Sequence, residues 1–465
     1  MSDYTIKELE EWNAKIEHIA CESGLEYYQQ EFEIVSYDDM LCYEAYVGMP
    51  SHYPHWSYGK AYERQRILNK YNIAGLPYEM VINSNPCIAY LMKDNTLLLQ
   101  ILTIAHVYGH NDFFKNNRLF KDGTNAELTV GMFKNHADRI RSYIQDPSIG
   151  YHRVEKILNA AHALRFQCSR VPGEIKQNDE DIKRIIMDKY NKPVSDHPLL
   201  EHKAEETQNA DIPELAKIPI KPEENILKFI AEFGNLTEWE KDIIKIIIAE
   251  SQYFIPQIET KIMNEGWASY WHYTILNKLG LPQSLHIEFL KRHNQVIRRF
   301  EGSINPYYVG FKIFDNLYKN NPDNRNKIFE VREIERDESF IRRYLTYDLC
   351  NEMNLFEYQK KGSQNAVTEI SDEDGWRKIR DTLASSVGMN SIPVIKVEEY
   401  INKNNLLVLT HEFDGREIEL THAYETIKHI VDIWGGKVML ITWLEGVKKS
   451  ITCDEEKRIA LEKIN

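Results

Sequence analysis

The sequence has few cysteines and lacks any long apolar segment. Its six cysteines are scattered among 465 residues without a C-x-x-C pair, so we interpret them as free thiols that mostly fill the core. No segment approaches the roughly 18 uninterrupted apolar residues that a membrane-spanning helix needs. The first residues, MSDYTIKELEEWNAKIEHIA, show no basic region followed by an apolar run, so no export signal is expected. These absences predict a cytoplasmic protein.

Positive charge is also in deficit. The chain has 57 lysines and arginines against 71 aspartates and glutamates, which gives a formal net charge of -14. Proteins that wrap DNA or adhere to anionic membrane surfaces rely on an excess of positive charge. We therefore expect neither a nucleic-acid partner nor membrane insertion.

The length and the apolar spacing indicate a large helical part. At 465 residues the chain exceeds the roughly 250 to 300 residues at which a single core stops growing, so two domains are expected. Between residues 7 and 20, apolar side chains recur at helical spacing. Similar patterns return at residues 97–109, 151–166, 240–278 and 284–300. The first three quarters of the chain are therefore predicted to be mainly helical.

The composition changes twice along the chain. Residues 171–224 are rich in Pro, Asp, Glu and Lys and poor in aromatics, which is typical of an exposed excursion between helices. After about residue 365 come three β-like runs, IPVIKVEEY, NLLVLTHEF and KVMLITWLE, with a turn-like FDGR and the helical segment THAYETIKHIVDIWGG. The predicted class is α+β, with a mainly helical domain at 1–364 and a smaller α+β domain at 365–465.

Two histidines in AHVYGHNDFFKNN have the spacing of a metal site. On a helix, His106 and His110 lie on one face and can present two imidazoles to one ion. The spacing is that of the zinc-protease motif H-E-x-x-H, but Val107 occupies the position of the general base. A lone H-x-x-x-H pair is a weak signal, so a further ligand must come from elsewhere.

The segment ETKIMNEGWASYWHY supplies such a ligand. Glu265 lies in a helical stretch, and His272 follows two turns later on the same face. His106, His110 and Glu265 make a His2Glu set, which is found in catalytic zinc sites of peptidases and in the facial triad of non-heme iron oxygenases. We expect a divalent metal, zinc in the first place and iron as the alternative, with His272 in an outer, supporting role.

A hydrolase without the glutamate of H-E-x-x-H must take its base from another helix. Glu155 and Glu250 are the candidates. Glu155 belongs to a polar stripe on VEKILNAAHAL that continues through Asn159 and His162, and the stripe either supports the metal site or pairs with basic neighbours and caps backbone. Glu250 follows a strongly apolar helix and is either a buried base or a solvated helix end.

Two further segments have residues suited to ligand contact. The aromatic loop GMPSHYPHWSYGKAY contains His55 and Trp56, which either contact substrate or cover the core. Asn111, Asp112 and Lys115 follow the histidine pair and either hold substrate or cap the end of the helix.

Many long runs, in order along nearly the whole chain, resemble the stage V sporulation protein R (SpoVR-like) family. The runs are FEIV, GMPSHYPHWSYGK, VINSNPCIAYLMKDNT, AHVYGHNDFFKNN, VEKILNAAHAL, YFIPQIETKIMNEGWASYWHY, INPYYVG and SFIRRYLTYDL. Asn159 departs from the family, which usually carries Asp there. The string NEGWA also looks like the glutamate-bearing helix of certain zinc metallopeptidases, so the helical domain is expected to be metallopeptidase-like.

The resemblance implies a cytoplasmic protein linked, in spore-forming bacteria, to formation of the spore cortex, a modified peptidoglycan. Our first hypothesis is a metal-dependent hydrolase, an amidase or peptidase, that acts on a peptidoglycan precursor or on a protein of the cortex pathway. The second is a metal-stabilised regulatory or scaffold protein without catalysis, whose C-terminal domain binds a partner. The third is an iron-dependent oxidase or oxygenase.

Overall fold

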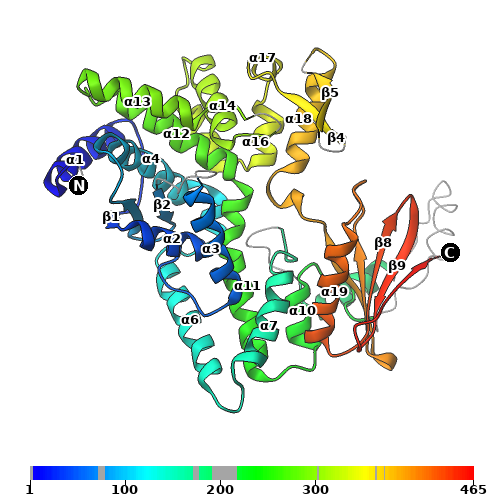
Figure 1. Ribbon diagram of the computed structural model, residues 1–465. Helices are drawn as coiled ribbons and strands as arrows, with labels where there is room; N and C mark the ends of the chain where they lie inside the picture. Colours follow the sequence, from blue (N-terminus) through cyan, green and yellow to red (C-terminus); the bar gives the residue numbers. More distant parts are fainter. Residues whose placement is uncertain are drawn as a thin grey trace. The chain divides into compact units, whose positions relative to one another are not determined.

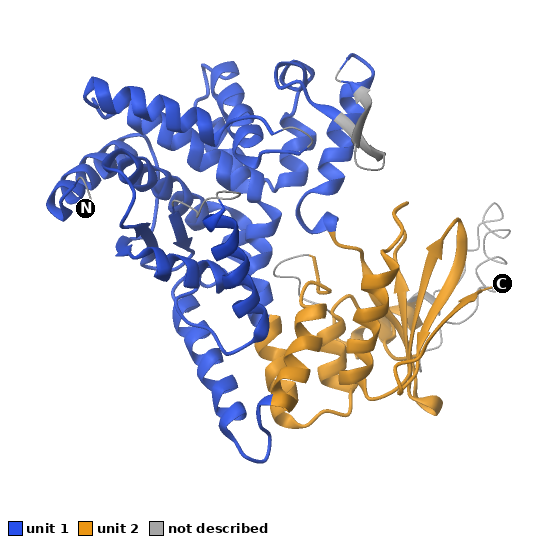
Figure 2. Ribbon diagram, viewed as in Figure 1, with its two compact units in different colours: residues 1–151, 249–391 blue, residues 152–248, 392–465 orange. Residues whose placement is uncertain are grey.

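Helices dominate the first three quarters of the chain, as their apolar spacing predicts (Figure 1). The computed structural model describes residues 4–71, 79–170, 177–190, 217–300, 303–361, 364–370 and 372–464. The predicted α+β class is confirmed. Contacts divide the chain into two units, residues 1–151 with 249–391 and residues 152–248 with 392–465 (Figure 2). The boundary near residue 365 that the sequence indicates stays a prediction.

The helices of the first unit are α1 (Ile6–Glu22), α2 (Tyr37–Ala45), α3 (Trp56–Lys70), α4 (Leu97–Asn116), α5 (Arg118–Gly123), α6 (Thr129–Gln145), α12 (Lys261–Lys278), α13 (Gln283–Val296), α14 (Pro306–Asn320), α15 (Lys327–Ile334), α16 (Asp337–Tyr344), α17 (Tyr347–Glu352) and α18 (Gly375–Ser386). Its strands are β1 (Gln30–Val35), β2 (Glu79–Ile82), β3 (Cys87–Met92), β4 (Phe356–Lys361) and β5 (Gln364–Ile370). The helices α7 (Tyr151–Leu164) and α11 (Glu238–Glu259) each contain a unit boundary.

Helix α12 packs against both α4 and α14 at the centre of the first unit. The crossings are close because glycines lie at the contacts. A Cβ on Gly109 would come within 2.7 Å of the Cα of Ala268, and a Cβ on Gly266 within 2.3 Å of Gly310. Only residues without a side chain allow the backbones to approach this closely. Glu265 is the neighbour of Gly266 on α12. The glycines therefore determine the distance between Glu265 and α4.

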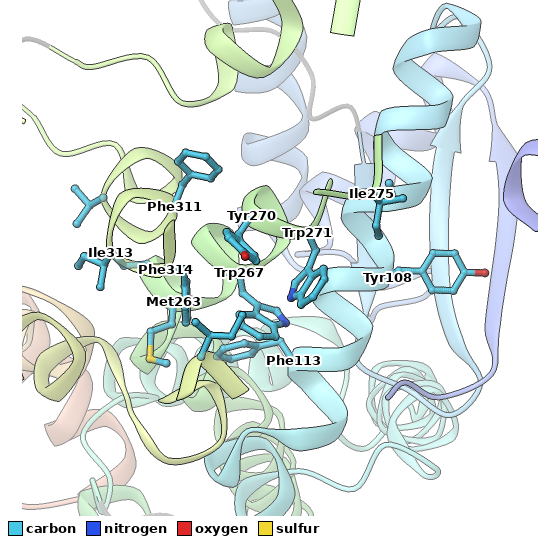
Figure 3. Packing of buried hydrophobic residues seen from close by; sticks show 14 of the residues in the cluster. Tyr108, Phe113, Met263, Trp267, Tyr270, Trp271, Ile275, Phe311, Ile313 and Phe314 are labelled. Carbon is cyan, nitrogen blue, oxygen red and sulfur yellow. The ribbon is translucent and has the colours of Figure 1, made fainter. Parts of the chain in front are cut away.

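Aromatic side chains fill the space around this helix trio (Figure 3). Trp267 is fully buried and lies edge-on to Phe314 and Trp271, with ring centroids 5.0 and 5.5 Å apart. Its indole Nε1 donates a hydrogen bond to Asp112 at 2.9 Å, so its one polar atom is satisfied. Complete burial of a large apolar side chain contributes about 1.5–3 kcal/mol. The aromatic packing thus fixes α12 rigidly against α4.

A small sheet lies beside α4. Its strand order is β1-β3-β2, with β3 parallel to β1 and antiparallel to β2. Both β2 and β3 contact α4. The register pairs Glu79, the first residue of β2, with Leu91. The sheet therefore holds a carboxylate next to the helix that bears the histidine pair.

The second unit contains a five-stranded sheet of order β10-β9-β8-β7-β6. Its strands are β6 (Ile395–Ile401), β7 (Leu406–His411), β8 (Val438–Leu444), β9 (Val447–Cys453) and β10 (Ile459–Lys463), and its further helices are α8 (Asp179–Tyr190), α10 (Ile226–Phe233) and α19 (Leu420–Trp434). The three predicted β-like runs are β6, β7 and β8, and α19 connects the parallel pair β7 and β8. Gly435 ends α19 with a φ of 74°, which is the left-handed conformation that glycine adopts freely.

The predicted excursion at 171–224 is only partly described. Residues 171–176 and 191–216 lie outside the described residues, α8 lies within the segment, and Glu223 forms a β-bridge with Val397. The cysteines are free thiols as expected; four are buried, and Cys21 and Cys42 are exposed. No helix in the described ranges is long and apolar enough to cross a membrane.

Candidate metal centre

Helix α4 presents the histidine pair to the interior of the first unit. Thr96 begins the helix as its N-cap and accepts a hydrogen bond from the Leu99 N–H at 3.3 Å. The helix is buried on almost every face. His106 is completely buried and His110 nearly so. Their separation by one turn places both rings on the side that faces α12 and β2.

Two carboxylates complete this arrangement, one from α12 and one from β2. Glu265 Oε2 lies 3.8 Å from His106 Nε2 and 3.6 Å from His110 Nε2. Glu79 Oε1 lies 3.1 Å from His106 Nε2 and 3.7 Å from His110 Nε2. One ligand atom from each of the four side chains lies within 4.8 Å of all the others. We call Glu79, His106, His110 and Glu265 the His2Glu2 cluster.

The chemistry of the His2Glu2 cluster suits a divalent cation. Burial raises the pKa of Glu79, but His106 and His110 outweigh it and hold the value at about 2. Burial lowers the pKa of His106, but Glu79 and Glu265 outweigh it and raise the value to about 9. Within the described ranges, the buried atoms Glu79 Oε2 and Glu265 Oε2 have no hydrogen-bond partner. Buried carboxylate oxygens need a partner, and a cation among the four side chains would supply it.

The Nδ1 atoms of His106 and His110, which point away from the cluster, each lie next to a hydrogen-bond partner. His110 Nδ1 lies 2.8 Å from Asn264 Oδ1, and His106 Nδ1 lies 2.8 Å from His272 Nδ1. A metal-binding histidine that coordinates through Nε2 donates its Nδ1–H to such a neighbour, which fixes the tautomer and the ring orientation. The structure therefore brings His272 to the position expected from the sequence, directly behind His106.

The hydrogen bonding continues inward to a third imidazole. His272 Nε2 lies 2.7 Å from His293 Nδ1, so His106, His272 and His293 form a chain of three rings. Burial lowers the pKa of His272 far below its usual range and that of His293 to about 4, with a smaller contribution from His106. Both inner rings are therefore neutral near pH 7, and each can accept a proton on one side and donate one on the other.

Tyr307 lies beside the cluster at the start of α14. Its ring stacks on that of His106, with centroids 6.1 Å apart. Burial raises its pKa far above the usual range, and the negative charges of Glu265 and Glu79 add to this effect. The phenol therefore keeps its proton and remains a hydrogen-bond donor next to the two carboxylates.

A pocket of about 940 Å³ lies beside the cluster. Glu265 and Tyr307 both line it. Its size is within the range of small-molecule sites, which is about 300–1,000 Å³. Of the four cluster residues, Glu265 lines this pocket, so one ligand of the cluster borders a space that can admit a small molecule.

Sequence reasoning found three members of the cluster and missed the fourth. Glu79 is a charged residue at the head of the short apolar strand EMVI, and that contrast is its only local signal. Asn264 stands next to Glu265 in the segment NEGWA, and Tyr307 lies in INPYYVG. His293 on α13 carried no motif.

Glu250, one of the two predicted bases, lies in a different buried cluster of the first unit. Its Oε1 is 3.2 Å from His136 Nδ1, and its Oε2 accepts a hydrogen bond from the Tyr53 hydroxyl at 3.4 Å. His52 Nε2 is 3.7 Å from the same oxygen. Burial raises the pKa of Glu250 although His136 and Tyr53 act against it. Glu250 is therefore a buried, partnered carboxyl rather than a solvated helix end.

The residues after the histidine pair contact the segment that leads into β1. Asn111 accepts a hydrogen bond from the Tyr28 N–H at 2.8 Å, and Asp112 accepts one from the Glu26 N–H at 2.8 Å. Lys115 forms an ion pair with Glu26 at 3.0 Å. These contacts anchor the end of α4; a role in substrate binding stays a prediction.

The remaining predicted residues lie elsewhere. His55 is the N-cap of α3, and with Trp56 it lines a second, aromatic pocket of about 610 Å³. Glu155, Asn159 and His162 lie half-buried on α7, in the second unit. The roles predicted for these five residues stay predictions.

Comparison with known proteins places the whole cluster within a shared sequence region. A family model described as SpoVR like protein matches residues 3–392. The uncharacterized protein YcgB of Escherichia coli (strain K12) is 32% identical over 476 residues, which cover 94% of this chain and 92% of that relative. No solved structure matches the chain significantly. All four residues of the His2Glu2 cluster lie in the matched range.

Proposed function

Since this chain belongs to the SpoVR-like family, we propose that it is a metal-dependent hydrolase that serves spore-cortex formation in the cytoplasm. Its substrate would be an amide bond in a peptidoglycan precursor or in a protein of the cortex pathway. The observation that carries the proposal is the convergence of Glu79, His106, His110 and Glu265, one of which, Glu265, also lines a pocket. The metallopeptidase-like character of the helical part belongs to the same proposal.

His106, His110 and Glu265 would hold the ion, with zinc as the first choice. A divalent ion in such a site lowers the pKa of a bound water and polarises a carbonyl group. Asn264 and His272 orient the two imidazoles through their Nδ1 atoms. The rigid packing of α12 against α4 keeps these groups in place before substrate arrives.

Glu79 is the best-placed general base. It stands within 3.1 to 3.7 Å of both histidine Nε2 atoms, on the strand side of the cluster. It thereby fills the role that Val107 leaves open in the motif on α4. Glu250, in contrast, is already engaged by His136 and Tyr53. Tyr307, which stays protonated and lines the pocket, can donate a hydrogen bond to a substrate oxygen.

The proposal is tested by separating metal binding from turnover. Metal content is measured by mass spectrometry on protein purified without chelator, for the wild type and for His110→Ala and Glu265→Ala. Near-stoichiometric metal in the wild type and its loss in both folded variants is expected. No metal in the wild type, even after zinc or Fe(II) is added, would refute the proposal.

Glu79→Gln then tests the base. This variant keeps an oxygen near the ion, so it should retain metal and fold but fail to restore cortex formation in a spore-forming host that lacks its own SpoVR-like protein. Glu330→Gln, a change of an exposed glutamate on α15, is the control and should restore it. Full function of Glu79→Gln with metal bound would favour the scaffold hypothesis instead.

An iron-dependent oxidase is the second candidate. Two histidines and a carboxylate also form the ligand set of non-heme Fe(II) oxygenases. Such an enzyme needs no general base between the two histidines, so Val107 in this chain would be no obstacle. Iron rather than zinc in the purified protein, together with oxygen consumption, would select this function.

A further inference from the structure

The pocket that Glu265 lines also contains positively charged side chains. Among its described lining residues, Lys261, Arg292 and Arg298 carry positive charge, and Glu265 is the acid. The chain as a whole has a net charge of -14. A concentration of positive charge on such an acidic protein, in a pocket that also borders Glu265 of the cluster, indicates a ligand of opposite charge.

Of these three cations, only Arg292 forms an ion pair with a residue of the described ranges, and that ion pair is long. Lys261 and Arg298 form no ion pair with any residue of the described ranges. Arg292 Nε lies 3.7 Å from Glu288 Oε1, beyond hydrogen-bond distance, and this buried nitrogen has no hydrogen-bond partner among those residues. Their donors therefore remain available to a bound molecule.

The fold sets these cations at defined places around the cluster. Lys261 begins α12 and lies about one turn before Glu265, on the same face, about 6 Å along the axis. Arg292 precedes His293, the last ring of the imidazole chain, on α13. Buried Asn305 donates hydrogen bonds to the backbone oxygens of Val296 and Arg298 at 2.8 and 2.7 Å, which fixes the segment that carries Arg298.

We propose that this pocket binds an acidic group of the substrate, a carboxylate or a phosphate, between Lys261, Arg292 and Arg298. The inference rests on the proposed function. Binding of the acidic group in this pocket would position the bond to be cleaved at the His2Glu2 cluster. Guanidinium groups bind carboxylate and phosphate oxygens in a bidentate manner, and the lysine adds a compact charge. The substrate class is then an anionic molecule or chain end whose susceptible bond lies a few ångströms from its acid.

Isothermal titration calorimetry of the full-length protein as purified provides the test, with inorganic phosphate and succinate as probes. The wild type should bind at least one of them, and binding of only one identifies the acidic group. Lys261→Gln and Arg298→Gln should each weaken that binding roughly tenfold, as expected for loss of a charged hydrogen-bond donor. Lys291→Gln, a neighbouring exposed lysine of α13 that does not line the pocket, should leave it unchanged.

A further variant separates this inference from the proposed function. Glu265→Ala should lose metal but still bind the anion, because the cations and not the ion hold it. Three results would each overturn the inference: loss of anion binding in Glu265→Ala, wild-type affinity in both Lys261→Gln and Arg298→Gln, or no binding by the wild type. A wild type that binds the anion but no metal would leave the anion site standing and refute the hydrolase.

Discussion

His106 and His272 face each other through their Nδ1 atoms at 2.8 Å in the interior of the first unit. Only one of the two nitrogens can carry the proton when both rings are neutral. Coordination through Nε2 requires His106 to be the donor and His272 the acceptor. The position of the proton on buried His272 thus determines how well His106 can bind an ion.

His272→Leu should therefore weaken metal binding, by about 10- to 100-fold, because the acceptor for the His106 Nδ1–H is lost. His272→Asn, whose side-chain oxygen can take the position of Nδ1, should lose much less. Competition with a chromophoric chelator measures both affinities. Equal losses in the two variants would mean that His272 acts through packing alone.

Gly266→Ala tests the close crossing of α12 and α14. Its Cβ would lie 2.3 Å from Gly310 backbone atoms, so the helices must separate, and the free energy of unfolding should fall by about 1–3 kcal/mol. Gly131→Ala on α6 is the control, since nothing lies within 4 Å of its added Cβ. Urea denaturation compares the two. Metal affinity should fall with stability in Gly266→Ala, because Glu265 moves with the helix.

Acid should destabilise the metal-free protein through the inner histidines. Burial lowers the pKa of His293 to about 4, whereas an unfolded histidine titrates near 6.5. Between these values the unfolded chain binds more protons, so the stabilisation is fully present above pH 6.5 and is lost as the pH falls to about 4. The loss amounts to about 3 kcal/mol.

The variant His293→Gln should flatten this pH dependence. Urea denaturation at pH 4.5, 5.5 and 6.5 measures the slopes of both proteins. If the slopes are the same, His293 is not a neutral, buried ring in the folded state.

A bound ion should raise thermal stability. Binding to the folded state alone adds about 2.7 kcal/mol when the free ion is at 100 times its Kd. The unfolding midpoint should therefore rise with added zinc in the wild type and fall after treatment with chelator. His110→Ala should show neither shift. A zinc effect of equal size in His110→Ala would place the binding outside the His2Glu2 cluster.

The sequence predicts much of the fold because local periodicity carries that information. The helical spacing located α4 and α12, and alternating apolar runs located β6, β7 and β8. The sheet formed by β1, β2 and β3 was not expected in the helical part, because its strands are short and their pairing depends on register between distant segments.

Local patterns also explain which residues of the site could be predicted from the sequence. His106 and His110 are one helical turn apart, so spacing alone relates them. Glu79 has no such relation to them, since β2 is brought to α4 only by its antiparallel pairing with β3. Glu265 also reaches α4 only through tertiary structure, but the segment NEGWA marked it, whereas no motif marked Glu79.

The order of the ligands along the chain has a consequence for biosynthesis. His106 and its supporting His272 are 166 residues apart, and Glu265 belongs to the later segment. A nascent chain therefore exposes the histidine pair long before the ribosome has synthesised α12. Until then the chain offers only part of a chelate, and its affinity for an ion is weak. An ion that binds the His2Glu2 cluster would therefore do so after this long loop has closed, and it would then tie distant segments together as a cross-link does.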